Sequence, residues 1–238
     1  SSDLPMDNDR FTREYFRLLT AKLAPFGYEE KELTDAVWKG TAAMVSNNGS
    51  RTNCEAFWET FASVLGEEAY GTRQVFDDFY ENEFNDAKKV CGYNSKAAAV
   101  VRSFRDAGCR LVLASNPIFP MTAQKARMRW AGVDPDDFVY LTAYENSGYC
   151  KPNPDYYREI LEKTGFTAEE CLMVGNDVNE DMPAMEVGMK VFIVTDFLIN
   201  KNNESFKITK FVDSRTLKVQ LSNGKKGYLF TSQGYLVD

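Results

Sequence analysis

Two aspartates four residues apart, Asp177 and Asp181, follow a short apolar segment and a Gly-Asn turn. The segment, Cys171–Val174, predicts a strand of a parallel sheet with both faces buried. Ligands of open parallel sheets bind beyond the carboxyl ends of the strands. Two carboxylates that converge there are costly unless a cation lies between them. Mg²⁺ suits the position because it takes few carboxylates and keeps its waters for a phosphate. We therefore predict a magnesium site at Asp177 and Asp181; the alternative is that both acids cap a helix N-terminus.

Polar residues follow two other predicted elements. Ser115 and Asn116 come after the predicted strand Arg110–Ala114, and Lys151 opens a Lys-Pro-Asn-Pro loop that contains Asn153. Singly, Ser115 would be a helix cap and Lys151 a solvated loop residue. Together with the acidic pair, a hydroxyl and a lysine are what phosphoryl chemistry requires, because they hold phosphate oxygens and neutralise developing charge. The candidate catalytic residues are Lys151 and Ser115, and the candidate substrate-binding residues are Asn116 and Asn153.

The elements that position these residues fall into three stretches. From Phe11 to about Asn85, apolar residues recur at helical spacing and no strand is expected. From Ser95, helices and strands alternate, with glycine after each helix, which predicts an α/β fold with a doubly wound parallel sheet. The expected strands are Arg110–Ala114, Phe138–Thr142, Cys171–Val174 and Val191–Thr195. The expected helices are Ser95–Ala107, Met121–Ala131, Asp155–Thr164 and Glu180–Val187. The tail predicts strands at Phe206–Val212, Thr216–Leu221 and Tyr228–Phe230, with a hairpin turn at Ser222-Asn223-Gly224.

Composition narrows the classes of function. The chain has 238 residues and a net charge of −7, so nucleic acid is expected to be a poor partner. It has no histidine, which excludes histidine triads and histidine metal sites. Its five cysteines are odd in number and show no Cys-x-x-Cys spacing, which fits free thiols in a reducing cytosol. We find neither a signal peptide nor an apolar run near the ~20 residues of a membrane span, and we expect a cytoplasmic protein. The oligomeric state is left open.

Three segments resemble conserved motifs of the haloacid dehalogenase superfamily, in the same order. Leu-Val-Leu-Ala-Ser-Asn-Pro resembles motif II, Lys-Pro-Asn-Pro-Asp-Tyr-Tyr resembles motif III, and Val-Gly-Asn-Asp-Val-Asn-Glu-Asp-Met resembles motif IV. The helical stretch is similar to the inserted cap of the phosphoglycolate-phosphatase-like branch. The resemblance implies a helical cap domain at 8–90, a Rossmann-like core domain at 91–203, and a β-rich tail at 204–238 that is added to the core.

The resemblance also implies a reaction. It implies a Mg²⁺-dependent phosphatase of small phosphorylated metabolites that forms an aspartyl-phosphate intermediate. In that mechanism Ser115 binds the phosphoryl group, and Lys151 stabilises nucleophile and phosphate. Asp177 is a metal ligand, and Asp181 supports the metal site.

One motif of the superfamily is not found in the sequence. Motif I, an apolar strand ending in Asp-x-Asp-x-Thr, supplies the nucleophile on the central strand and would be expected just before Leu4. The tail from Gly227 to Asp238 resembles it in shape, with Thr231 and Gln233 where the aspartates would be. The tail could fill the central position or could be the last strand of an appended β-element, and we favour the second. The leading hypothesis is therefore a phosphatase without its nucleophile, inactive as this chain. The alternative is a non-catalytic module that binds phosphate, metal or a partner.

Overall fold

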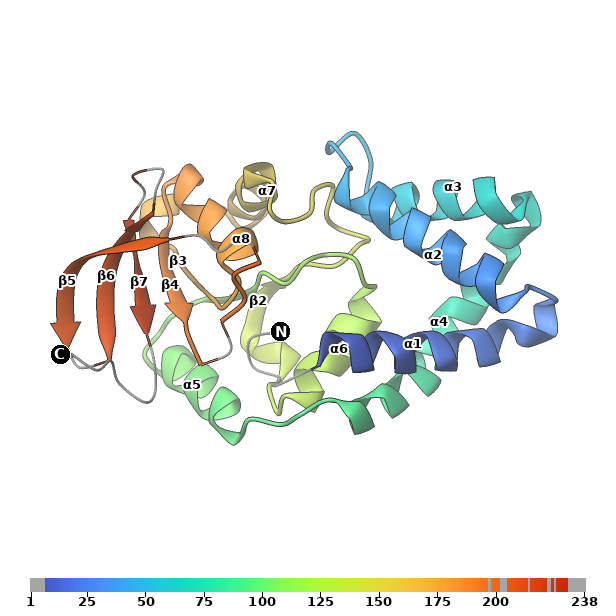
Figure 1. The fold of residues 1–238 in the computed structure, drawn as a ribbon, viewed down its shortest axis with the longest axis horizontal. Coiled ribbons are helices and arrows are strands. Elements are labelled where there is room, and N and C mark those ends of the chain that lie inside the picture. The colour runs from blue at the N-terminus through green and yellow to red at the C-terminus, as the bar shows by residue number, and fades with distance from the viewer. Residues whose placement is uncertain are drawn as a thin grey trace. The chain divides into compact units, whose positions relative to one another are not determined.

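The computed structural model describes residues 7–196, 198–201, 205–213, 215–221, 224 and 226–230. The chain forms two compact units, the first extending to Cys150 and the second beginning at Lys151. Figure 1 labels the α-helices and most of the strands.

The first part of unit one is helical, as the sequence predicts. The α-helices are α1 (Asn8–Leu23), α2 (Glu30–Val45), α3 (Asn53–Leu65) and α4 (Arg73–Glu81), and the 3-10 helices are η1 (Ala24–Phe26), η2 (Glu67–Thr72) and η3 (Glu83–Val90). Helix α3 begins with a capping box in which Thr52 and Glu55 satisfy each other's main-chain N–H groups. Aromatic side chains form the core of this bundle, and those that are almost completely buried are Trp58, Phe61, Phe79 and Phe84.

The second part of unit one is a β-α-β unit. Helix α5 (Ser95–Asp106) precedes strand β1 (Leu111–Leu113), helix α6 (Met121–Trp130), the 3-10 helix η4 (Pro135–Asp137) and strand β2 (Phe138–Leu141). Strands β1 and β2 pair in parallel. The loop before helix α3 is bonded to the loop after β2, because the Asn53 N–H donates to the Ser147 carbonyl at 2.8 Å and the Gly49 N–H to the Gly148 carbonyl at 3.0 Å.

Unit two contains a five-stranded sheet. Its elements are α7 (Pro154–Thr164), η5 (Ala168–Glu170), β3 (Leu172–Gly175), α8 (Val178–Asp181), η6 (Met182–Val187), β4 (Lys190–Val194), β5 (Phe206–Asp213), β6 (Thr216–Leu221) and β7 (Lys226–Phe230). The strand order is β3-β4-β7-β6-β5, as Figure 1 shows. Strand β4 is parallel to both of its neighbours, whereas β5, β6 and β7 form an antiparallel meander.

The structure corrects the helix that the sequence predicts at Glu180–Val187. The α-helix begins earlier, at Val178, and ends after one turn at Asp181, where the 3-10 helix η6 takes over. Pro183 lies in the first turn of η6. Because proline has no N–H and its ring clashes with the preceding turn, the α-helical bonding pattern cannot continue through it.

The α/β fold class with a parallel core, a helical N-terminal part and C-terminal strands is confirmed. Among the described residues, however, the parallel strands lie in two sheets, and β1 and β3 each pair on one side only. The tail joins the second sheet through β7, which lies beside β4 and therefore not beside β3. Thr231 and Gln233, and two residues of the predicted hairpin turn, Ser222 and Asn223, lie outside the described residues.

The structure bears on the cysteines and on membrane-spanning helices. All five cysteines are free thiols, and Cys150 is buried. In the part of the chain that the structure describes, no helix combines the length and the apolar character that crossing a membrane requires.

Candidate functional site

The candidate site in unit two is built on a buried ion pair between Lys151 and Asp181. The Lys151 Nζ donates to the Asp181 Oδ1 at 2.6 Å, and the two side chains are only 5% and 6% exposed. The other carboxylate oxygen, Oδ2, accepts the main-chain N–H groups of Asn176 and Asp177, both at 2.9 Å. Both oxygens of Asp181 are therefore bonded, and the carboxylate ties the loop of Lys151 to the turn after β3.

Gly175, the last residue of β3, allows this arrangement. A Cβ atom at this position would overlap the Asp181 carboxylate, beginning with Oδ2. The Asp181 N–H also donates to the Asp177 carbonyl at 2.8 Å, which closes the turn. The glycine that ends the apolar segment is thus required for the carboxylate to reach the main chain.

Asp177 is the N-cap of helix α8. Its Oδ1 accepts the N–H groups of Asn179 at 2.9 Å and Glu180 at 3.0 Å, so the alternative of a helix cap describes part of what this side chain does. Oδ2 takes part in neither bond. Asp177 can therefore cap the helix with one oxygen and offer the other to a cation.

The donor set fits a magnesium ion held by few protein ligands. Within the described ranges, no group of three or more aspartate, glutamate or cysteine side chains has the arrangement of a closed metal site. Mg²⁺ is commonly bound through one or two carboxylates, with phosphate and water in its other positions. Of the two predicted ligands, Asp177 has an oxygen to offer, whereas Asp181 already bonds through both.

Two tyrosines that the sequence reasoning did not single out surround the lysine. The Lys151 ammonium lies 5.8 Å from the ring centre of Tyr156 and 5.9 Å from that of Tyr157, and both rings are buried. The Tyr157 hydroxyl donates to the Glu180 carbonyl at 2.7 Å. Burial, reinforced by the Asp181 carboxylate, raises the pKa of Tyr157 well above its ordinary value, so the hydroxyl stays protonated. In the sequence, the Tyr-Tyr pair directly after Lys-Pro-Asn-Pro-Asp is the feature from which aromatic rings near Lys151 could have been predicted.

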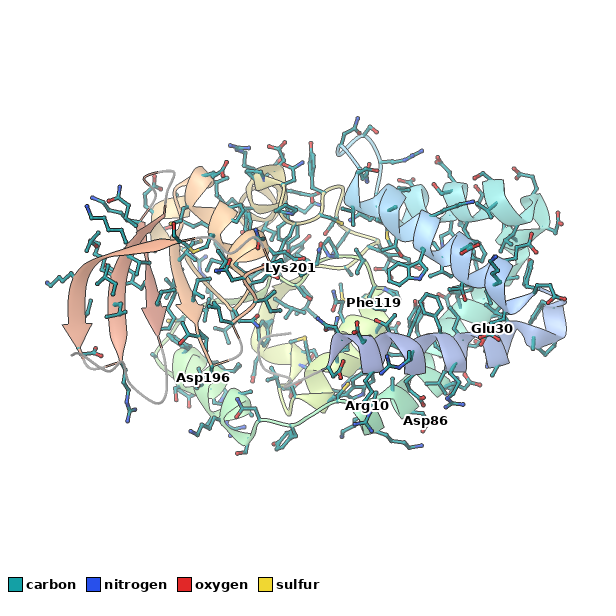
Figure 2. The ribbon with its side chains drawn as sticks, in the orientation of Figure 1. Arg10, Glu30, Asp86, Phe119, Asp196 and Lys201 are labelled. Atoms are coloured by element: carbon teal, nitrogen blue, oxygen red, sulfur yellow. The ribbon has the colours of Figure 1, made fainter. Side chains whose placement is uncertain are left out.

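Glu180 is a further acid near the pair. Burial raises its pKa most, the Asp177 carboxylate raises it further, and Lys151 opposes the rise. Lys201, labelled in Figure 2, also lowers it. The negative charge at this strand end is thus distributed over three acids, and two lysines counter it.

The remaining predicted residues have identified structural partners. In unit two, the Asn153 Oδ1 accepts the Asp155 N–H at 2.9 Å and caps helix α7. In unit one, the Ser115 carbonyl accepts the Thr142 hydroxyl at 2.7 Å. The Asn116 carbonyl accepts the Ile118 N–H at 2.9 Å. That these residues meet Lys151 at one phosphate remains a prediction.

The structure shows neither of the single-residue alternatives that the combined pattern of Ser115, Lys151 and the acidic pair disfavours. Helix α6 begins at Met121 with Pro120 as its N-cap, so Ser115 is not a helix cap. Lys151 is not a solvated loop residue, because it is 6% exposed. Its partner Asp181 comes thirty positions later, and such a contact leaves no local sequence signal.

Comparison with known proteins shows the family. A family model for haloacid dehalogenase-like hydrolases matches residues 9–188, and the chain belongs to this family. No curated protein matches the chain.

Several solved structures are similar. A predicted phosphoglycolate phosphatase from Haemophilus somnus 129PT is 16% identical, with 80% of this chain and 81% of that chain covered and a TM-score of 0.44. CbbY from Rhodobacter sphaeroides, in complex with phosphate, is 15% identical over 80% and 83%, with a TM-score of 0.49. A 2-haloacid dehalogenase from Pseudomonas syringae pv. tomato DC3000 is 16% identical over 79% and 80%, also with a TM-score of 0.49. At these values the similarities carry no argument about activity.

We predict that Gly175→Ala destabilises the second unit by about 2 kcal/mol or more, because the added methyl group displaces the Asp181 carboxylate from its two N–H donors and leaves them buried without a partner. Urea unfolding measures the loss. Gly71→Ala is the matched control, since its Cβ would meet nothing within 4 Å, and it should change stability by less than about 0.5 kcal/mol. Equal stability of the two variants would contradict the assigned role of Gly175.

Proposed function

We propose that the chain is a Mg²⁺-dependent phosphatase-type hydrolase of small phosphorylated metabolites that is inactive as this sequence, because the sequence does not contain the nucleophilic Asp-x-Asp-x-Thr motif. The observation that carries the proposal is the buried Lys151–Asp181 pair beside Asp177, in a member of the haloacid dehalogenase-like hydrolase family. A lysine held by a buried carboxylate at the end of a parallel strand places a fixed positive charge where ligands of such sheets bind.

The residues have distinct proposed roles. Asp177 would hold Mg²⁺ through the oxygen that does not cap helix α8, and the metal would neutralise charge on the phosphoryl group. Lys151 would contribute a second positive charge towards phosphate oxygens. Asp181, a positioning residue, would hold that ammonium and the Asn176–Asp177 turn in place. Ser115 would bind the phosphoryl group, and Asn116 and Asn153 would contact the substrate.

The domain assignment belongs to the same proposal. Residues 8–90 would act as a helical cap domain, 91–203 as the Rossmann-like core domain, and 204–238 as the β-rich tail. The helices of the first stretch and the β4–β7 pairing of the last are compatible with this division. Substrate choice would then reside in cap residues.

The nucleophile is the missing part. The sequence contains two Asp-x-Asp pairs, Asp7 with Asp9 and Asp134 with Asp136, and neither continues as Asp-x-Asp-x-Thr. Asp7 caps helix α1 by accepting the Arg10 N–H at 3.1 Å, and Asp134 accepts the Asp136 N–H at 3.0 Å. These aspartates start helices instead of following a strand, so we do not assign the nucleophile to either pair.

A non-catalytic module that binds phosphate, metal or a partner is the second candidate, and the lack of Asp-x-Asp-x-Thr in the sequence favours it. The residues encoded just before Ser1 separate the two candidates. If a strand ending in Asp-x-Asp-x-Thr is encoded there and its addition produces turnover, the phosphatase proposal is supported. If adding the residues encoded before Ser1 produces no turnover while the protein still binds phosphate, the proposal of a non-catalytic binding module is supported.

We predict that Mg²⁺ binds weakly and that Asp177→Asn reduces its affinity at least tenfold in isothermal titration calorimetry. Asparagine can still cap helix α8, so the variant removes the charge and keeps the local fold. The control is Asp155→Asn, which removes an exposed carboxylate paired with Arg158. Identical Mg²⁺ binding by wild type and Asp177→Asn would disprove the metal assignment.

We also predict that the 238-residue chain shows no Mg²⁺-dependent hydrolysis of p-nitrophenyl phosphate. Lys151, Asp177 and Asp181 can hold a phosphate and its charge, but covalent catalysis needs a carboxylate placed for in-line attack on phosphorus. Vanadate binding, measured in parallel, shows whether the site is formed. Hydrolysis by the wild type that disappears in Asp177→Asn would prove the prediction wrong.

A further inference from the structure

The meander of β5, β6 and β7 has two different faces. On one face the side chains of Leu217, Val219 and Leu229 are buried. Gly227 lies on the same face, and a Cβ there would lie 3.2 Å from the end of the Met182 side chain, which places helix η6 against this side. The buried face is therefore the core side of the meander.

The opposite face carries a row of paired residues that runs across four strands. Phe192 of β4 pairs with Tyr228 of β7, Tyr228 pairs with Lys218 of β6, and Lys218 pairs with Lys210 of β5. Residues that pair directly place their side chains on the same face of a sheet. Lys218 Nζ lies 5.8 Å from the centre of the Tyr228 ring. The row thus changes from aromatic to cationic along one line.

A second row adds two more lysines to this face. Gln220 of β6 pairs with Lys226 of β7 on one side and with Lys207 of β5 on the other. We call the set Lys207, Lys210, Lys218 and Lys226 the lysine face. Lys207, Lys210 and Lys226 are exposed, and Lys218 and Tyr228 are half-buried.

The positive charges of the lysine face are not neutralised within the described residues. Its lysines form none of the ion pairs that the described part of the chain contains. The one acid in the three strands, Asp213, pairs with Thr216 at the end of the same face, where its carboxylate accepts the Arg215 N–H at 2.7 Å and forms none of the ion pairs of the described residues. Lys210 and Lys218 are direct cross-strand partners, and like charges in that position destabilise a sheet. A cost of this kind is offset when an anion binds across the strands.

We propose that the lysine face and Tyr228 bind single-stranded nucleic acid. Proteins that bind single strands without sequence preference combine lysines that follow the phosphates with aromatic rings on which bases stack. Phe192, next to Tyr228 in the row, extends the aromatic part of the face. An acidic peptide would use the lysines but not the rings, so the row as a whole favours nucleic acid.

The net charge of −7 does not oppose this binding. Charge is screened over about 10 Å at 0.1 M salt, so a bound strand responds to the lysines beneath it more than to distant acids. The proposal is also independent of the phosphatase chemistry, because none of its residues belongs to the Lys151–Asp181 site.

The test is fluorescence anisotropy with a labelled, mixed-sequence single-stranded DNA oligonucleotide, at about 50 and 200 mM salt. We expect binding that weakens with salt and that prefers the single strand to a duplex of the same sequence. Lys210→Glu/Lys218→Glu should lower the affinity at least tenfold, because two phosphate contacts become repulsive. Tyr228→Leu should lower it by about tenfold, since stacking is lost, while the salt dependence is unchanged.

The control is Lys39→Glu/Lys96→Glu, which makes the same change of charge at two exposed helical lysines and should leave binding unchanged. Circular dichroism reports whether the sheet is retained, and Lys210→Gln/Lys218→Gln replaces the glutamate variant if it is not. The proposal is overturned by an equal loss in the control. It is also overturned by tighter binding to polyglutamate or to anionic lipid vesicles than to the oligonucleotide, or by an unchanged affinity in Tyr228→Leu.

Discussion

A single carboxylate, that of Asp181, holds the second unit's candidate site together. It receives one hydrogen bond from a buried ammonium, that of Lys151, and two from the main chain of the turn after β3. Removing one member of a buried ion pair typically costs about 3–5 kcal/mol, because the remaining charge is left without compensation. The loop that starts unit two, the end of β3 and the first turn of α8 therefore depend on one another.

Because of this interaction, the two aspartates, Asp177 and Asp181, have different structural roles. Both were expected to face a cation, and the structure places a lysine against Asp181, whereas Asp177 caps a helix with one oxygen. The helix-cap and metal-ligand interpretations of Asp177 are compatible, since a carboxylate has two oxygens. Gly175 makes the division possible, because any side chain there would occupy the space of the Asp181 carboxylate.

Local patterns in the sequence predict where helices and strands lie. They do not predict which residues far apart in the sequence come into contact. The apolar segment Cys171–Val174 and its Gly-Asn turn gave the strand and the acidic end, and the structure places that strand at Leu172–Gly175. The burial of Lys151 was missed because its partner lies thirty residues further along the chain. The early end of the helix at Asp181 could have been predicted from Pro183, whose missing N–H ends α-helical bonding. The lysine face was missed because net charge is an average over the chain, whereas cross-strand register decides which side chains meet.

A double-mutant cycle on Lys151→Met and Asp181→Asn tests directly whether the pair organises the site. The free energy of unfolding is measured by urea denaturation for the wild type, both single variants and the double variant. If the ion pair organises the site, each single substitution strongly lowers the free energy of unfolding. The double variant then loses at least about 1 kcal/mol less free energy of unfolding than the sum of the losses of the two single variants. Additivity within about 0.5 kcal/mol would show that the two residues act independently, and would contradict the account.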